Sequence, residues 1–190
     1  MKIKYGLYLF PLLAIGCQNA SHTHQIKTDA IANKFIDAFY AFDRESLQTI
    51  MVSAAKSQPE ILYYQKWAEC AHYKVLNRLN YFEKSDSHVI FPVTVEDDLM
   101  KALEIDFNVT DTFHITIQNG SIIEVKTSSN DLDVYYEAKE WVTTNRPELV
   151  KKACEGIWVG GPTPCECVLG MIKGFVEFTE MKKQATNDSP

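Results

Sequence analysis

Apolar residues recur every three or four positions between residues 28 and 73, which predicts three helices. The first is expected to begin at Thr28 or Asp29, because both residue types cap helices well. Its apolar face would consist of Ile31, Phe35, Phe39 and Phe42. Asp43 would begin the second helix. Ser57 would begin the third, with Pro59 in its first turn, where proline is well tolerated.

The period changes to two after residue 73, which predicts strands. We expect strands over residues 74–83, 87–95 and 103–109, with a single helical turn at 96–101. The clearest pattern is TFHITIQNGSIIEVKT, residues 112–127. Its two alternating runs meet at Asn119 and Gly120, which accept the positive φ of a tight hairpin turn. Phe113, Ile115 and Ile117 are expected to share one face of this hairpin.

Helical periodicity returns from residue 131. One helix is expected to end near Thr144, and a second to open at NRPE, residues 145–148. The last would open at TPCE, residues 163–166, a capping box with proline in the first turn. The pattern as a whole predicts an α+β protein, with three N-terminal helices, an antiparallel sheet and a C-terminal helical extension.

The amino-terminal residues have the composition of a secretory signal. Lys2 and Lys4 precede an apolar run at residues 5–15, which is shorter than the roughly twenty residues that a membrane-spanning helix needs. The sequence LAIGC, residues 13–17, resembles the lipobox of bacterial lipoproteins. This resemblance implies that Cys17 is lipidated and anchors the mature chain, in the outer membrane if the cell is Gram-negative. The alternatives are a cleaved signal that leaves Cys17 as a thiol, or a hydrophobic amino terminus without that role.

Composition excludes one class of function. Hydrophobic residues make up 46% of the chain and aromatic residues 12%, which is typical of a folded globular domain. The net charge is −6, with no stripe of lysine and arginine. Such a chain lacks the basic surface that nucleic-acid binding requires, so no nucleic-acid partner is expected.

Four cysteines follow the leader. In an exported protein they are disulfide candidates: Cys70, Cys154, Cys165 and Cys167. Helical residues two apart do not face each other, so Cys165 and Cys167 are not expected to pair. Cys154 is expected to bridge to one of these two and so to staple a helical hairpin. Cys70 would pair with the remaining thiol or stay buried, and a redox or metal role, or free thiols, are the alternatives.

The order of three helices, long antiparallel strands and the hairpin TFHITIQNGSIIEVKT resembles the nuclear-transport-factor-2-like superfamily. That group includes ketosteroid isomerases and SnoaL-like polyketide cyclases, and the resemblance covers roughly residues 28–129. It implies a sheet curved into a cone around the helices, with a mostly apolar pocket at the open end. The candidates to line or fill this pocket are Phe39, Tyr40, Tyr64, Trp67 and His114. An unrelated α+β sandwich is the alternative.

The predicted organisation has five parts: a signal peptide at 1–16, a polar tether at 17–27, the α+β domain at 28–129, the helical extension at 130–182 and a disordered tail at 183–190. Glu104, Asp106 and His114 alternate with apolar residues, so they are expected on the solvent side. We therefore predict no catalytic residue, no metal site and no cofactor.

Three functions fit this sequence. The first is a non-enzymatic module of the cell envelope that binds a small hydrophobic ligand or a partner protein. The second is an isomerase, dehydratase or cyclase that acts on a small hydrophobic substrate inside the cone. The third is an assembly protein that forms a homodimer through its sheet. An ionisable side chain buried in the pocket, with a hydrogen-bonding partner, would favour the enzyme.

Overall fold

The computed structural model describes residues 18–79, 82–85, 87–156 and 163–187. The predicted signal peptide and Cys17 lie outside these ranges. Three helices open the described chain: α1 (Gln18–Tyr40), α2 (Arg44–Ile50) and α3 (Gln58–Cys70). Helix α1 begins well before Thr28, so the stretch expected as a tether is partly helical. Asp43 caps α2, and its carboxylate accepts a hydrogen bond from the Ser46 amide.

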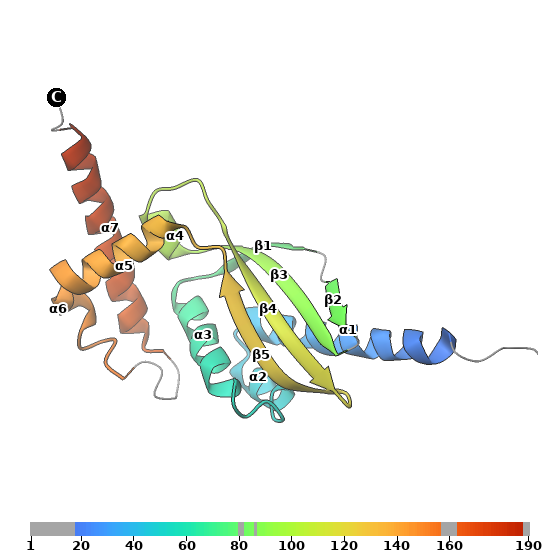
Figure 1. The fold of residues 1–190 in the computed structure, drawn as a ribbon. Coiled ribbons are helices and arrows are strands. Elements are labelled where there is room, and N and C mark those ends of the chain that lie inside the picture. The colour runs from blue at the N-terminus through green and yellow to red at the C-terminus, as the bar shows by residue number, and fades with distance from the viewer. Residues whose placement is uncertain (1–17, 80–81, 86, 157–162, 188–190) are drawn as a thin grey trace, which may run out of the picture.

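The sheet contains the strands β1 (Lys74–Arg78), β2 (Phe82–Ser85), β3 (His88–Glu96), β4 (Val109–Gln118) and β5 (Ser121–Ser129). Among the described residues the strand order is β1-β3-β4-β5, with β2 also paired to β3, and every pairing is antiparallel. Asn119 (φ 50°) and Gly120 (φ 75°) form the predicted hairpin turn between β4 and β5. The three long strands are visibly curved (Figure 1).

Two strand predictions were wrong. The run at 74–83 divides into β1 and β2, and residues 103–108 form no strand at all. Asp97 caps a helix, α4 (Asp98–Ala102), whose C-cap is Leu103, and Glu104 follows with a φ of 52°. The apolar residues after that turn pack against the core from a loop. Their alternation therefore reflects anchoring of the loop, because β4 begins only at Val109.

The core lies between the first helices and one face of the sheet. Phe35 and Phe39 of α1 are fully buried, and their rings lie 5.5 and 4.9 Å from the ring of Phe113 in β4. Side chains along β3 and β4 alternate between buried and half-buried. The predicted α+β class, with helices at both ends of the chain and a curved antiparallel sheet, is confirmed.

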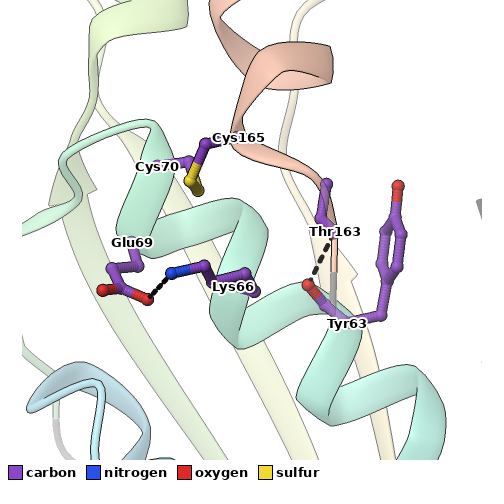
Figure 2. The surroundings of a disulfide bond; sticks show 6 residues. All are labelled: Tyr63, Lys66, Glu69, Cys70, Thr163 and Cys165. Carbon is purple, nitrogen blue, oxygen red and sulfur yellow. Dashed lines mark hydrogen bonds and ion pairs between the residues drawn. A yellow bond between two sulfur atoms is a disulfide. The ribbon is translucent and has the colours of Figure 1, made fainter. Parts of the chain in front are cut away.

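Three helices follow the sheet: α5 (Asp133–Asn145), α6 (Pro147–Val150) and α7 (Cys165–Asn187). They lie together at one end of the sheet, on the far side from the β4–β5 hairpin (Figure 1). A disulfide joins Cys70 at the end of α3 to Cys165 at the start of α7. Beside it, the Thr163 hydroxyl donates a 2.9 Å hydrogen bond to the Tyr63 carbonyl (Figure 2).

A second disulfide joins Cys154 to Cys167, one of the two pairings expected for Cys154. Cys70 takes the remaining thiol. Disulfides form and persist in oxidising compartments, so the protein folds outside the reducing cytosol. Within the described ranges, none of the helices combines the length and the hydropathy that crossing a membrane would take.

Candidate functional site

A pocket of about 320 Å³ opens between the sheet, α3 and α5. Four carboxylates belong to its wall: Glu60, Asp97, Asp111 and Asp131. Four tyrosines join them: Tyr64, Tyr73, Tyr135 and Tyr136. Helix α3 and the sheet provide one side of the pocket, and the C-terminal extension provides the other. The wall is thus far more polar than the resemblance to cone-shaped domains implies.

Asp111 is the best-supported functional group of this pocket. It lies in β4 with Val109 and Phe113 on either side along the same face, and it is only 1% exposed. The Tyr64 hydroxyl donates to its Oδ1 at 2.5 Å, and the Tyr40 hydroxyl donates to its Oδ2 at 2.8 Å. Burial raises the pKa of Asp111 to about 6, although both hydrogen bonds act to lower it.

The tyrosines around Asp111 act as hydrogen-bond donors. Burial raises the pKa of Tyr64 and Tyr73 well above the ordinary tyrosine value, and the nearby charge of Asp111 adds to this effect. Burial likewise raises the pKa of Tyr40. All three phenols therefore stay protonated at neutral pH, so they can hold an anionic carboxylate or donate to a ligand.

Asp97 has one oxygen that accepts hydrogen bonds and one that has no partner in the described part of the chain. Its Oδ1 caps α4 and accepts hydrogen bonds from the amides of Leu99 at 2.8 Å and Met100 at 3.0 Å. Its Oδ2 is buried and accepts no hydrogen bond from the described residues. The side chain is 1% exposed, and burial raises its pKa above the usual aspartate value.

The carboxylates of the pocket have little positive charge to balance them. Asp131 accepts hydrogen bonds from the hydroxyls of Ser129 at 2.5 Å and Tyr136 at 3.3 Å. Lys139 is the one cationic residue among the described residues of the wall, and it is exposed. In the described part of the chain, no salt bridge reaches any of the four carboxylates.

The pocket residues expected from sequence are only partly the residues found. Tyr64 lines the pocket, and Tyr40 supports it by its hydrogen bond to Asp111. Phe39 is buried in the core instead, and Trp67 packs against that core, so neither belongs to the wall.

His114 also lies away from the pocket. It follows Phe113 in β4, so its side chain projects from the opposite face of the sheet. There its Nε2 lies 3.2 Å from the Ser128 hydroxyl. Glu104 and Asp106 are exposed, as expected.

Asp111 itself was missed, although the alternation of β4 places it on the inward face. Asp97 was missed because the helix cap that positions it falls inside a short turn. No group of three or more histidine, cysteine, aspartate or glutamate side chains in the described ranges is arranged to hold a metal ion.

Comparisons with known proteins add little to this picture. No family model matches the chain. A search of curated proteins finds no match either. Among solved structures, a protein of unknown function with a cystatin-like fold from Xanthomonas campestris is similar, with 17% sequence identity and a TM-score of 0.39. The match covers 55% of this chain and 91% of that chain.

Proposed function

We propose that this chain is an exported protein that binds a small molecule in the pocket around Asp111. The observation that carries the proposal is the position of that carboxylate. A residue with a purely structural role there would be apolar, like Val109 and Phe113 on the same face. Burying a carboxylate is costly, and perturbed ionisable groups in clefts are typical of functional sites.

We further propose that the chain is a nuclear-transport-factor-2-like domain. Three helices followed by a curved antiparallel sheet support this assignment, as does the β4–β5 hairpin with its Asn-Gly turn. In that superfamily the ligand site is the pocket inside the curved sheet, which agrees with a site beside β4 and β5.

Filling the pocket tests the binding proposal. Thr127 lines the pocket from β5, so Thr127→Trp would place an indole ring inside it. Lys126→Trp is the matched control, because neighbouring strand residues face opposite sides of the sheet and Lys126 is exposed. A fragment library is screened by ligand-observed NMR against the full-length, disulfide-bonded chain. Hits should bind the wild type and Lys126→Trp and lose binding to Thr127→Trp. Hits that bind all three proteins equally would reject the pocket as the site.

A second candidate function is an isomerase, dehydratase or cyclase that uses Asp111 to transfer a proton. The pKa of about 6 favours it, because a proton-transfer group works best when its pKa lies near the operating pH. Tyr64 would keep its hydrogen bond to Asp111, and Tyr73 would donate a hydrogen bond to a developing oxyanion. Such an enzyme would exchange C–H protons next to a carbonyl in deuterated water, and Asp111→Asn would slow this exchange at least 100-fold, as detected by mass spectrometry. Exchange that is unchanged in Asp111→Asn would reject this role.

We also propose that Cys17 carries a lipid anchor. The lipobox-like sequence LAIGC supports it, and the two disulfides agree with export. Two or three acyl chains would hold the domain stably at a membrane. Mass spectrometry of the amino-terminal peptide should find an acylated Cys17 as the first residue, and Cys17→Ser should release the chain from the membrane fraction. An unmodified Cys17 thiol would refute the anchor.

A further inference from the structure

The charge in the pocket wall is not balanced by the described residues of the protein. Three aspartates lie close together in this wall: the charge of Asp131 helps to raise the pKa of Asp97 and of Asp111, and the charge of Asp97 helps to raise the pKa of Asp111. Lys139 makes no salt bridge to them, and the tyrosines supply neutral hydrogen-bond donors. Like charges that share a cavity repel each other, so a cation bound there would relieve the repulsion.

Asp97 provides a second and independent indication. Its Oδ1 already caps α4, so the helix does not explain why Oδ2 has no partner among the described residues. Buried polar atoms are nearly always hydrogen-bonded, and the exceptions call for an explanation. Because Asp97 belongs to the pocket wall, a donor group on a ligand would satisfy this oxygen.

The tyrosines indicate what kind of cation would fit. Aromatic faces attract organic ammonium groups, and sites for such groups are commonly built from several aromatic rings. Four tyrosines line this pocket. Its volume of about 320 Å³ falls in the range of small-molecule sites. A bare metal ion fits less well, because no set of three suitable ligand side chains converges in the described chain.

We propose that the ligand of this pocket is a small organic cation, whose ammonium group donates hydrogen bonds to Asp97 and Asp111 and lies among the tyrosine rings. This inference rests on the proposed binding function and gives its ligand a chemical class. Asp111 keeps acceptor capacity beyond its two tyrosine hydrogen bonds, since an ionised carboxylate offers about four lone-pair sites. Lys139 and Glu60 are both exposed, so their charges offset each other and the three aspartates of the wall remain unbalanced.

A series of probes with nearly the same shape and different charge tests the proposal. Benzylamine, benzyl alcohol and benzoate are positive, neutral and negative at neutral pH. Binding of each to the full-length, disulfide-bonded chain is measured by calorimetry and ligand-observed NMR. We expect benzylamine to bind at least tenfold more tightly than benzyl alcohol, and benzoate to bind more weakly still.

Variants that each remove one negative charge test which residues cause the preference for the positively charged probe. Asp97→Asn keeps an oxygen acceptor for the α4 cap, and Asp111→Asn keeps the size of the side chain. Each should weaken benzylamine binding about tenfold, a clearly larger loss than for the neutral benzyl alcohol. Asp106→Asn removes the same charge from an exposed position outside the pocket wall, so it should change neither.

The outcomes separate the two proposals. Equal affinity for benzylamine and benzyl alcohol, unaffected by Asp97→Asn and Asp111→Asn but lost in Thr127→Trp, would overturn the cation and keep the binding pocket. Benzylamine binding that is equally weakened in Asp106→Asn would reduce the effect to the overall charge of the protein and would also overturn it. If benzylamine does not bind at millimolar concentration while neutral fragments do, the cation assignment fails.

Discussion

Asp111 lies on the buried face of β4, where the neighbouring residues of the same face are the apolar Val109, Phe113 and Ile115. Its carboxylate leaves bulk water on folding and receives two tyrosine hydrogen bonds in return. Burial raises the pKa of Asp111 by more than these hydrogen bonds lower it, so the pKa rises to about 6. The folded protein therefore binds a proton at Asp111 more tightly than the unfolded chain does. This contribution to stability is fully present below about pH 4 and is lost as the pH rises through about 6.

Asp111→Asn should remove this pH dependence. Between pH 4 and pH 7, the raised pKa of Asp111 should reduce the free energy of unfolding of the wild type by about 2 kcal/mol. The variant should lack that decrease, because asparagine does not titrate. Urea denaturation at a series of pH values measures the difference between the two proteins.

Asp106→Asn is the control for this experiment, because its side chain is exposed and it should follow the wild-type curve. A difference between wild type and Asp111→Asn that stays constant from pH 4 to pH 7 would contradict a raised pKa at this site.

The sequence contained the information needed to find Asp111 and lacked the information needed to find its partners. The alternation of β4 fixes which residues face inward, and Asp111 has the same parity as Phe113. Its contacts with Tyr40 and Tyr64 link residues 71 and 47 positions apart. Periodicity along one segment carries no information about such tertiary contacts.

Gly174 of α7 allows α7 and α5 to approach each other closely. A Cβ atom at Gly174 would lie 2.3 Å from Cγ2 of Val142 in α5, and Val142 is fully buried. The absence of a side chain thus sets the distance between the two helices. Tyr135 of α5 also packs edge-on against Phe175 of α7, with ring centroids 5.4 Å apart. Because Tyr135 is part of the pocket wall, this helix pair helps to position the site.

Gly174→Ala should lower the free energy of unfolding by about 1–3 kcal/mol, the usual cost of overpacking a core, even though alanine favours helices over glycine by about 1 kcal/mol. Adding Val142→Ala should reduce the cost of the alanine at 174, because the clashing methyl groups are gone. Thermal and urea unfolding measure both effects.

Lys173→Ala serves as the control, since this residue is exposed on the same helix. If Gly174→Ala were as stable as this control, the close contact between α5 and α7 would be refuted.

Elements were predictable where local chemistry and periodicity agree. The β4–β5 hairpin combines alternating runs with an Asn-Gly turn, and its structure matches the expectation. Residues 103–108 were wrongly predicted as a strand, because alternating apolar residues also occur in a loop that is anchored to the core. Asp97 caps the helical turn before this loop, and the turn continues to Ala102. The start of α1 was misjudged in a segment with few apolar positions.

At the scale of the whole molecule, the pocket depends on segments far apart in the chain. Asp111 lies in the sheet, while Tyr135 and Tyr136 belong to the C-terminal extension that follows it. A domain boundary near residue 129 would place the two sides of the site in different domains. The Cys70–Cys165 disulfide links α3 to α7 across a separation of 95 residues, and α7 in turn packs against α5. The sequence offered three cysteine pairings, and spacing alone could not identify the partner of Cys70.

The two disulfides should contribute unequally to stability. In the chain-entropy model, a cross-link stabilises more when it closes a longer loop of the unfolded chain. Closing a 95-residue separation is worth about 4.7 kcal/mol, whereas the 13-residue separation of Cys154–Cys167 is worth about 3 kcal/mol. The paired variant Cys70→Ala with Cys165→Ala should therefore lose more free energy of unfolding than Cys154→Ala with Cys167→Ala.

Urea denaturation of both double variants, under oxidising conditions, measures this difference. The ligand site supplies a second readout, because loss of the Cys70–Cys165 link frees α7, and with it α5, to move relative to α3. Fragment binding should then weaken more in that variant than in the other, even at low temperature where both remain folded. Equal losses of stability and equal binding in the two variants would mean that packing alone holds the extension in place.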